Sequence, residues 1–125
     1  MKKVVLVVED DIDLINIYKE ILELKNFKVH TADNGQEGVE KFKEVNPSIV
    51  IMDGDMPILD GYDAFSQIKE LDNNANVVIV TGIAEYESKN QEAIKKGLIK
   101  VIAKPLGVNQ LVELAEKYSK IQVED

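Results

Sequence analysis

The sequence predicts an α/β fold in which a doubly wound parallel sheet of five strands carries helices on both faces. Two observations predict this fold class. Five short runs rich in β-branched residues alternate with longer segments of helical spacing, and this repeat builds parallel sheets with right-handed crossovers. The run IVIM is apolar throughout, which is typical of a strand that is buried on both faces.

We expect strands at the five β-rich runs, which are Lys3–Val8, Phe27–Thr31, Ser48–Met52, Asn76–Val80 and Ile99–Ala103. The third run stops abruptly at Asp53, with Asp55 and Asp60 close behind. Burying a charge is costly unless it is paired or bound to a metal. Acids at the end of a buried strand therefore require either solvent or a cation.

The segments between the strands carry apolar residues at helical spacing. Asp11 is expected to cap the first helix, and Asn34 with Glu37 forms a capping pair at the start of the second. The fourth helix, around Glu85–Lys96, is mostly polar. The residues that we expect the helices to bury are, in chain order, Leu14, Tyr18, Ile21, Leu22, Val39, Phe42, Tyr62, Phe65, Ile68, Ala93, Ile94, Val108, Leu111, Val112, Ala115 and Tyr118.

Composition excludes several classes of protein. Fifteen Lys and Arg against 23 Asp and Glu give a net charge of −8, which disfavours direct binding to nucleic acid. The absence of cysteine excludes disulfides, thiolate chemistry and cysteine-ligated zinc. The apolar run Val4–Val8 is stopped by Glu9 and is too short for a signal peptide or a membrane span. We expect one cytoplasmic domain over residues 1–125, without an output domain or a membrane partner.

Parallel sheets of this kind bind ligands at the carboxyl ends of their strands. The polar residues expected at that edge are Glu9, Asp10, Asp53, Asp55, Thr81 and Lys104. Neighbouring carboxylates raise one another's pKa unless a cation joins them, and Mg²⁺ could bind Asp10, Asp53 and the backbone carbonyl of Asp55. Lys104 and the Thr81 hydroxyl could then stabilise a phosphoryl group, with Asp53 as the nucleophile that forms an acyl phosphate.

Four fragments in order, VVED, IMDGDMPILDG, VIVTG and VIAKP, make nearly the whole chain resemble a response regulator receiver domain. The resemblance implies a flavodoxin-like (βα)5 fold with strand order 2-1-3-4-5. It implies Asp53 as the phosphoacceptor, with Glu9 and Asp10 as the acidic pair that binds Mg²⁺, Glu9 through a water. It also implies Lys104 and Thr81 as the phosphoryl contacts, and a bond before Pro105 that is commonly cis in this family.

The resemblance further implies a stand-alone signalling switch that catalyses only its own phosphorylation and dephosphorylation. Its phosphodonor would be a histidine kinase or a phosphotransfer protein, since the single histidine, His30, stands alone on the second strand. Its target would be a protein that binds the face formed by the fourth helix, the fifth strand and the fifth helix.

The sequence also bears on three other kinds of site. The DGDM motif is similar to that of haloacid-dehalogenase phosphatases, so a small Mg²⁺-dependent phosphatase stays open as an alternative, although there the nucleophile lies on the first strand. A calcium-binding EF-hand loop starting at Asp53 would place Pro57 at its fifth position. A flavodoxin would need a phosphate-binding loop after the first strand, where Glu9–Asp13 would repel phosphate.

Two departures from the family pattern bear on signalling. Val101 stands where many receivers carry a Tyr or Phe that swings inward, so aromatic switching is not expected here. Asp55 and Ile83 stand at the positions that flank the phosphoryl group in the family. We expect Ile83 to exclude the hydrolytic water and to slow loss of the phosphoryl group.

Overall fold

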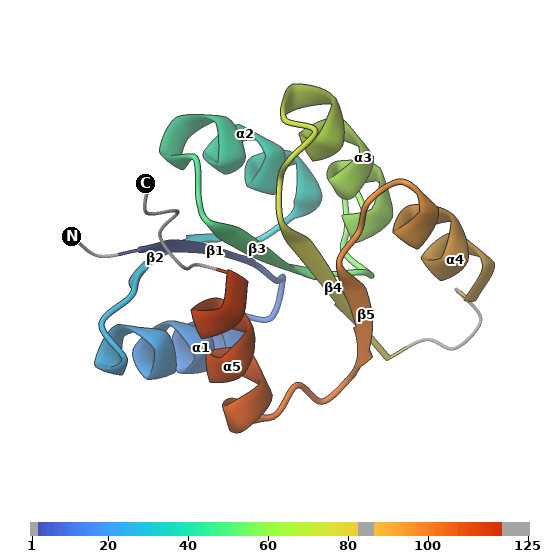
Figure 1. Cartoon of the computed structure of the whole chain (residues 1–125). Helices are drawn as coiled ribbons and strands as arrows, with labels where there is room; N and C mark the ends of the chain where they lie inside the picture. The colour runs from blue at the N-terminus through green and yellow to red at the C-terminus, as the bar shows by residue number, and fades with distance from the viewer. Residues whose placement is uncertain (1–2, 83–86, 119–125) are drawn as a thin grey trace.

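The computed structural model, which describes residues 3–82 and 87–118, confirms the predicted α/β class (Figure 1). The strands are β1 (Val4–Val8), β2 (Lys28–Ala32), β3 (Ile49–Asp53), β4 (Val77–Thr81) and β5 (Lys100–Ala103). The helices are α1 (Ile12–Leu24), α2 (Gly35–Val45), α3 (Gly61–Leu71), α4 (Glu87–Lys95) and α5 (Val108–Tyr118). All strands run parallel in the order β2-β1-β3-β4-β5, as the resemblance implied.

Helices cover both faces of the sheet. Figure 1 shows α1 and α5 on one face and α2, α3 and α4 on the other. Successive residues of a strand point to opposite faces, so Val5 and Val7 pack with α1 and α5, whereas Leu6 and Val8 pack with α2 and α3. This two-sided burial explains why the central strands consist of uninterrupted apolar residues.

Side-chain caps begin three helices at the carboxyl edge of the sheet. The Asp11 carboxylate accepts two backbone N–H groups of α1, at 3.0 and 3.2 Å, and Asp60 accepts one at the start of α3, at 2.9 Å. Asn34 accepts the N–H of Glu37 at 2.9 Å, and the Glu37 carboxylate accepts the N–H of Asp33 at 2.8 Å. The predicted caps of α1 and α2 are therefore confirmed.

Strands β2, β3 and β4 end one residue later than the runs that predicted them, whereas β1 and β5 end at the predicted residues. Asp53 and Thr81 are the last residues of β3 and β4 rather than the first residues after them. Both still pair with the neighbouring strand, Asp53 with Val80 and Thr81 with Ala103. The sheet ladder continues past the last apolar side chain because backbone pairing does not depend on side-chain polarity.

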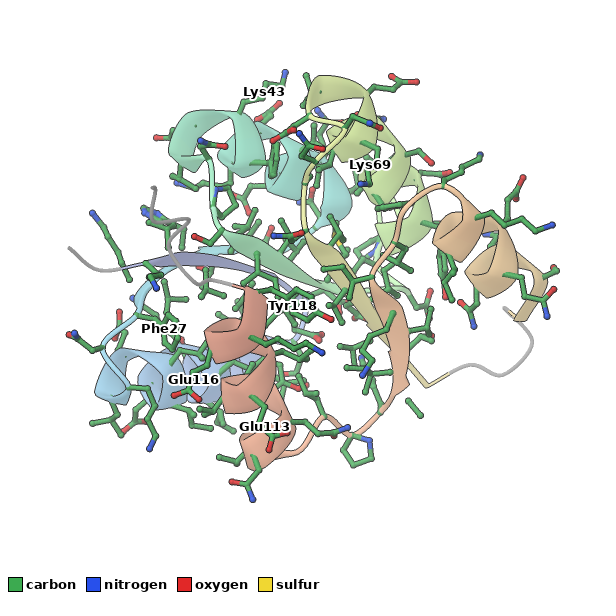
Figure 2. All side chains as sticks on the ribbon, in the orientation of Figure 1. Phe27, Lys43, Lys69, Glu113, Glu116 and Tyr118 are labelled. Carbon is green, nitrogen blue, oxygen red and sulfur yellow. The ribbon has the colours of Figure 1, made fainter. Side chains whose placement is uncertain are left out.

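Two expected core contacts are wrong. Val108 is 56% exposed, because α5 begins beyond the end of β5, and Leu114 is buried instead. Ile94 is 49% exposed, so of the two α4 residues that were expected to be buried, Ala93 is buried and Ile94 is not. Leu111 and Ala115 are buried as expected, whereas Val112 and Tyr118 are only half-buried. Glu113 and Glu116 lie on the exposed side of the helix (Figure 2). The predicted start of the fourth helix, at Glu85, lies outside the described residues.

No helix among the described residues is both long enough and apolar enough to cross a membrane.

Candidate functional site

Three acids meet at the carboxyl edge of the sheet. β1 and β3 are neighbours, with Val8 opposite Met52, so the residues that follow β1 lie beside the end of β3. One carboxylate oxygen each from Glu9, Asp10 and Asp53 lies within 4.8 Å of the other two. Glu9 and Asp53 are each only 4% exposed, whereas Asp10 faces solvent. The structure thus brings together the acids that the sequence placed at this edge.

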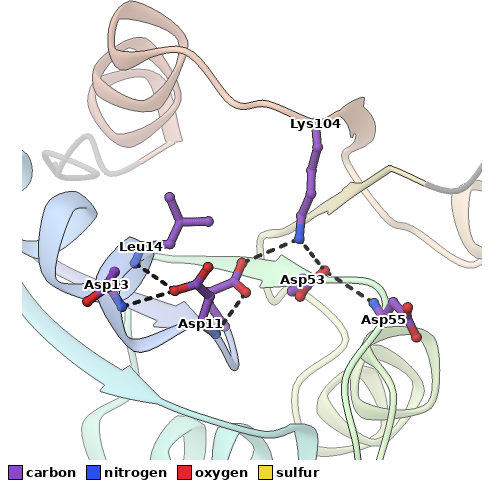
Figure 3. A network of polar contacts seen from close by, with 7 residues as sticks. Asp11, Asp13, Leu14, Asp53, Asp55 and Lys104 are labelled. Atoms are coloured by element: carbon purple, nitrogen blue, oxygen red, sulfur yellow. Dashed lines mark hydrogen bonds and ion pairs between the residues drawn. The ribbon is translucent and has the colours of Figure 1, made fainter.

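The Lys104 amine reaches the two buried acids from the loop after β5. Its backbone N–H donates to the carbonyl of Thr81 at 3.0 Å, which fixes the loop against the end of β4. Its Nζ lies 3.2 Å from Asp53 Oδ1 (Figure 3). It also lies 3.7 Å from Glu9 Oε1. The peptide bond between Lys104 and Pro105 is cis, as the resemblance implied.

The loop after β3 orients the Asp53 carboxylate. The backbone N–H of Asp55 donates to Asp53 Oδ1 at 3.2 Å (Figure 3). The N–H of Gly61 donates to the carbonyl of Gly54 at 3.1 Å, so α3 begins directly against the backbone that carries Asp53. A Cβ on Gly61 would lie 2.2 Å from the Asp53 carbonyl oxygen, and only glycine fits there. The sequence pattern indicates only that Gly61 belongs to a loop. The pair Asp60–Gly61 is the one signal in the sequence for a special backbone position here.

Burial and charge shift the pKa values of Glu9, Asp53 and Lys104. Burial, followed by the negative charge of Asp53, raises the pKa of Glu9 to about 7, against the opposing effects of the Asp11 N–H and Lys104. Burial also raises the pKa of Asp53, although the Asp55 N–H and Lys104 favour its charged form. Burial alone would lower the pKa of Lys104, but the charges of Asp53 and Glu9 raise it. The positive charge of Lys104 therefore does not fully offset the cost of burying the charged forms of Glu9 and Asp53.

The donor set fits a hard divalent cation. The three clustered acids offer only oxygen ligands, which Mg²⁺ prefers, and the exposure of Asp10 leaves room for the waters that Mg²⁺ retains. Asp10, Asp53 and the backbone carbonyl of Asp55 are the groups that would hold the ion. Glu9 Oε2 accepts the N–H of Asp11 at 3.1 Å, so this carboxylate already has a protein partner.

The remaining predicted positions fall in different places. Thr81 ends β4 next to the site and is 6% exposed. Val101 is half-buried and packs against the core beneath α2 and α3. His30 lies in the middle of β2, away from the acidic cluster, and burial lowers its pKa. Ile83 lies outside the described residues, so its shielding effect stays a prediction.

Sequence reasoning missed one polar contact near the site. It assigned Tyr62 to the core by its apolar ring, and the ring is indeed buried at 7% exposure. Its hydroxyl, however, donates to Oδ1 of Asn90 on α4. No short-range pattern could have revealed this contact, because the two residues are 28 positions apart.

Comparisons with known proteins point to one family. A family model of the response regulator receiver domain matches residues 5–116. The chemotaxis protein CheY of Halobacterium salinarum is 43% identical over 105 residues, covering 84% of this chain and 87% of the relative. The CheY of Thermotoga maritima is 37% identical over 121 residues, covering 96% and 100%.

Solved structures show the same arrangement of elements. A response regulator receiver domain protein from Clostridium thermocellum superposes with a TM-score of 0.85 at 28% identity, covering 93% of each chain. A chain of the CheX–CheY–BeF3–Mg²⁺ complex from Borrelia burgdorferi superposes with a TM-score of 0.83 at 30% identity. That match covers 94% of this chain and 90% of the other.

Proposed function

The chain belongs to the response regulator receiver family, and on that premise we propose that Asp53 accepts a phosphoryl group from a phosphohistidine in a Mg²⁺-dependent reaction. The observation that carries this proposal is the buried Asp53 carboxylate, held 3.2 Å from the Lys104 amine within a cluster of three acids. The phosphorylated chain then acts as a signalling switch through a change of conformation.

The chemistry assigns one role to each group. An Asp53 carboxylate oxygen attacks the phosphorus, the phosphorus–nitrogen bond of the donor breaks, and its electron pair goes to the imidazole nitrogen. The product is an acyl phosphate on Asp53. Lys104 and the Thr81 hydroxyl stabilise the phosphoryl oxygens, and Asp55 orients the acceptor through its backbone N–H. A bound Mg²⁺ supplies the positive charge that lets the phosphoryl group approach the acids.

Apart from the metal ion, these groups all belong to the chain itself, so the chain catalyses its own phosphorylation and dephosphorylation. A small donor such as acetyl phosphate can therefore replace the protein donor. The family match gives no support to the alternative of a haloacid-dehalogenase phosphatase.

The partners follow from the same chemistry. The donor is a histidine kinase or a phosphotransfer protein in the cytoplasm. The target is a protein that binds the face formed by α4, β5 and α5. A solved complex of a CheY with the protein CheX supports the view that receivers bind other proteins.

The test is labelling with acetyl phosphate and Mg²⁺, followed by intact mass. We expect one phosphoryl group per chain, stable in acid and labile in base. Asp53→Asn should abolish it, whereas Asp63→Asn, an acid of α3 outside the cluster, should label as the parent does. Undiminished labelling of Asp53→Asn would exclude Asp53 as the acceptor. Repeated turnover of a phosphomonoester with release of phosphate would favour the phosphatase instead.

A further inference from the structure

Helix α4 is attached to the rest of the molecule by few apolar contacts. Among its described side chains, residues 88–95, only Ala93 is buried. Ile94 is 49% exposed, and most of the other residues are polar and exposed. A helix that buries so little apolar surface gains little from packing, so polar contacts with its neighbours carry more weight in holding it.

Two such contacts join α4 to the start of α3. The Tyr62 hydroxyl donates to Oδ1 of Asn90, and the Lys89 Nζ lies 3.6 Å from Oδ2 of Asp60, the residue that caps α3. Lys89 Nζ also lies 5.7 Å from the centre of the Tyr62 ring. A hollow of about 140 Å³ lies between the two helices, lined in part by Phe65, so α4 has space to shift relative to α3.

The same tyrosine packs beside the phosphoacceptor. A Cβ placed on Gly54, the residue after Asp53, would lie 3.1 Å from Cε2 of Tyr62 and 3.2 Å from Cβ of Thr81. The Tyr62 ring and Thr81 therefore share one packing site at Gly54. A movement of Thr81 changes the space open to the Tyr62 ring, because interiors are close-packed.

We propose that Tyr62 couples the Asp53 site to α4, an inference that rests on the proposed function. A phosphoryl group on Asp53 accepts a hydrogen bond from the Thr81 hydroxyl and draws Thr81 toward it. The Tyr62 ring follows into the space released at Gly54, and its hydroxyl leaves Asn90. Helix α4 then loses one of its contacts with α3. This route uses an aromatic side chain of α3, whereas position 101 on β5 holds Val101, which has no polar atom to reach α4.

The test measures amide hydrogen exchange in α4 with and without beryllofluoride and Mg²⁺, which stand in for the phosphoryl group. In the parent, we expect exchange in residues 87–95 to accelerate about tenfold on addition, the effect of about one hydrogen bond. Tyr62→Phe keeps the ring and removes the hydroxyl, so its α4 should exchange about tenfold faster without any addition. Beryllofluoride should then add less than about twofold, because the bond is already absent.

Three further variants test whether the effect depends on the hydrogen bond between Tyr62 and Asn90. Asn90→Ala removes the other partner of the same hydrogen bond and should reproduce the Tyr62→Phe result. In the double variant, amide exchange in α4 should be no faster than in either single variant. Tyr118→Phe removes a phenol hydroxyl from α5 and should behave as the parent does.

The possible results distinguish a failure of this inference from a failure of the proposed function on which it rests. If the segment around Asp53 responds to beryllofluoride but α4 of the parent does not, or if α4 of Tyr62→Phe responds as strongly as the parent, the coupling through Tyr62 is wrong and the phosphoacceptor assignment stands. If the Asp53 segment of the parent shows no response, both the proposed function and this inference are overturned.

Discussion

At the scale of single residues, Ile58 has an unusual backbone for its type. Its φ is 73°, in the left-handed region that β-branched side chains rarely adopt because Cβ crowds the backbone. The N–H of Leu59 donates to the carbonyl of Pro57 at 2.8 Å, so a tight three-residue turn holds this conformation. The Ile58 side chain is 80% exposed and offsets little of the strain by burial.

We predict that Ile58→Gly raises the free energy of unfolding by about 1 kcal/mol, because relief of strain exceeds the entropy that glycine adds to the unfolded chain. Ile58→Ala removes the exposed side chain but keeps Cβ, so it should give no such gain. Urea unfolding of the two variants measures the difference. Equal stabilisation by alanine would mean that exposure, not backbone strain, is the cause.

The raised pKa of Glu9 predicts how the metal-free protein responds to pH. Its folded pKa of about 7 lies above the ordinary value of 4.5, so its contribution to stability is present below the unfolded pKa and is lost as the pH rises through the folded one. The raised pKa of Asp53 acts in the same direction. The thermal midpoint in a chelator should therefore fall between about pH 5 and about pH 8. Glu9→Gln should flatten this fall, and an unchanged slope would contradict the assignment.

At the scale of elements, the close approach of α3 to β3 makes Gly61 sensitive to substitution. We predict that Gly61→Ala costs about 1–3 kcal/mol of stability and slows acetyl phosphate labelling, since the added carbon displaces the backbone that carries Asp53. Gly107→Ala is the matched control, because the nearest atom to its new carbon lies 3.7 Å away, at Gln110. Chemical unfolding and labelling rates measure both effects. Equal losses in the two variants would refute the argument from close approach.

The sequence alone predicted the strands, the helices and the gathering of acids at one edge of the sheet. The carboxyl ends of parallel strands share one edge, so the residues that end the apolar runs, such as Asp53 and Lys104, could be placed together without coordinates. Periodicity failed where a helix extends past the sheet, as at Val108. It could not supply the contact between Tyr62 and Asn90, because that contact depends on how two helices cross.

At the scale of the whole molecule, the excess of negative charge links the stability of the fold to metal binding. The chain has a net charge of −8 and gathers three acids at one edge of the sheet. We predict that Mg²⁺ raises the thermal midpoint, by the equivalent of about 2.7 kcal/mol at a hundredfold excess over Kd. Calorimetry with and without Mg²⁺ measures the shift.

Asp10→Ala should remove most of that response. It should also raise the metal-free midpoint, because it deletes a repulsion between like charges. Glu20→Ala, which removes an exposed acid of α1, is the control for net charge alone. A response retained in full by Asp10→Ala would place the ion elsewhere.

The strand order also has a consequence for synthesis on the ribosome. β1 lies between β2 and β3, and Lys104 arrives only with the loop after β5. A nascent chain that has emerged as far as β3 can therefore bring Glu9 beside Asp53. At that point Lys104, whose amine contacts both carboxylates in the finished protein, has not yet been synthesised. Without that amine, Glu9 and Asp53 at the carboxyl edge of the unfinished sheet must either repel each other or take up a proton, and both cost stability until β5 emerges. Translation order thus makes β5 the step that completes both the sheet and its chemistry.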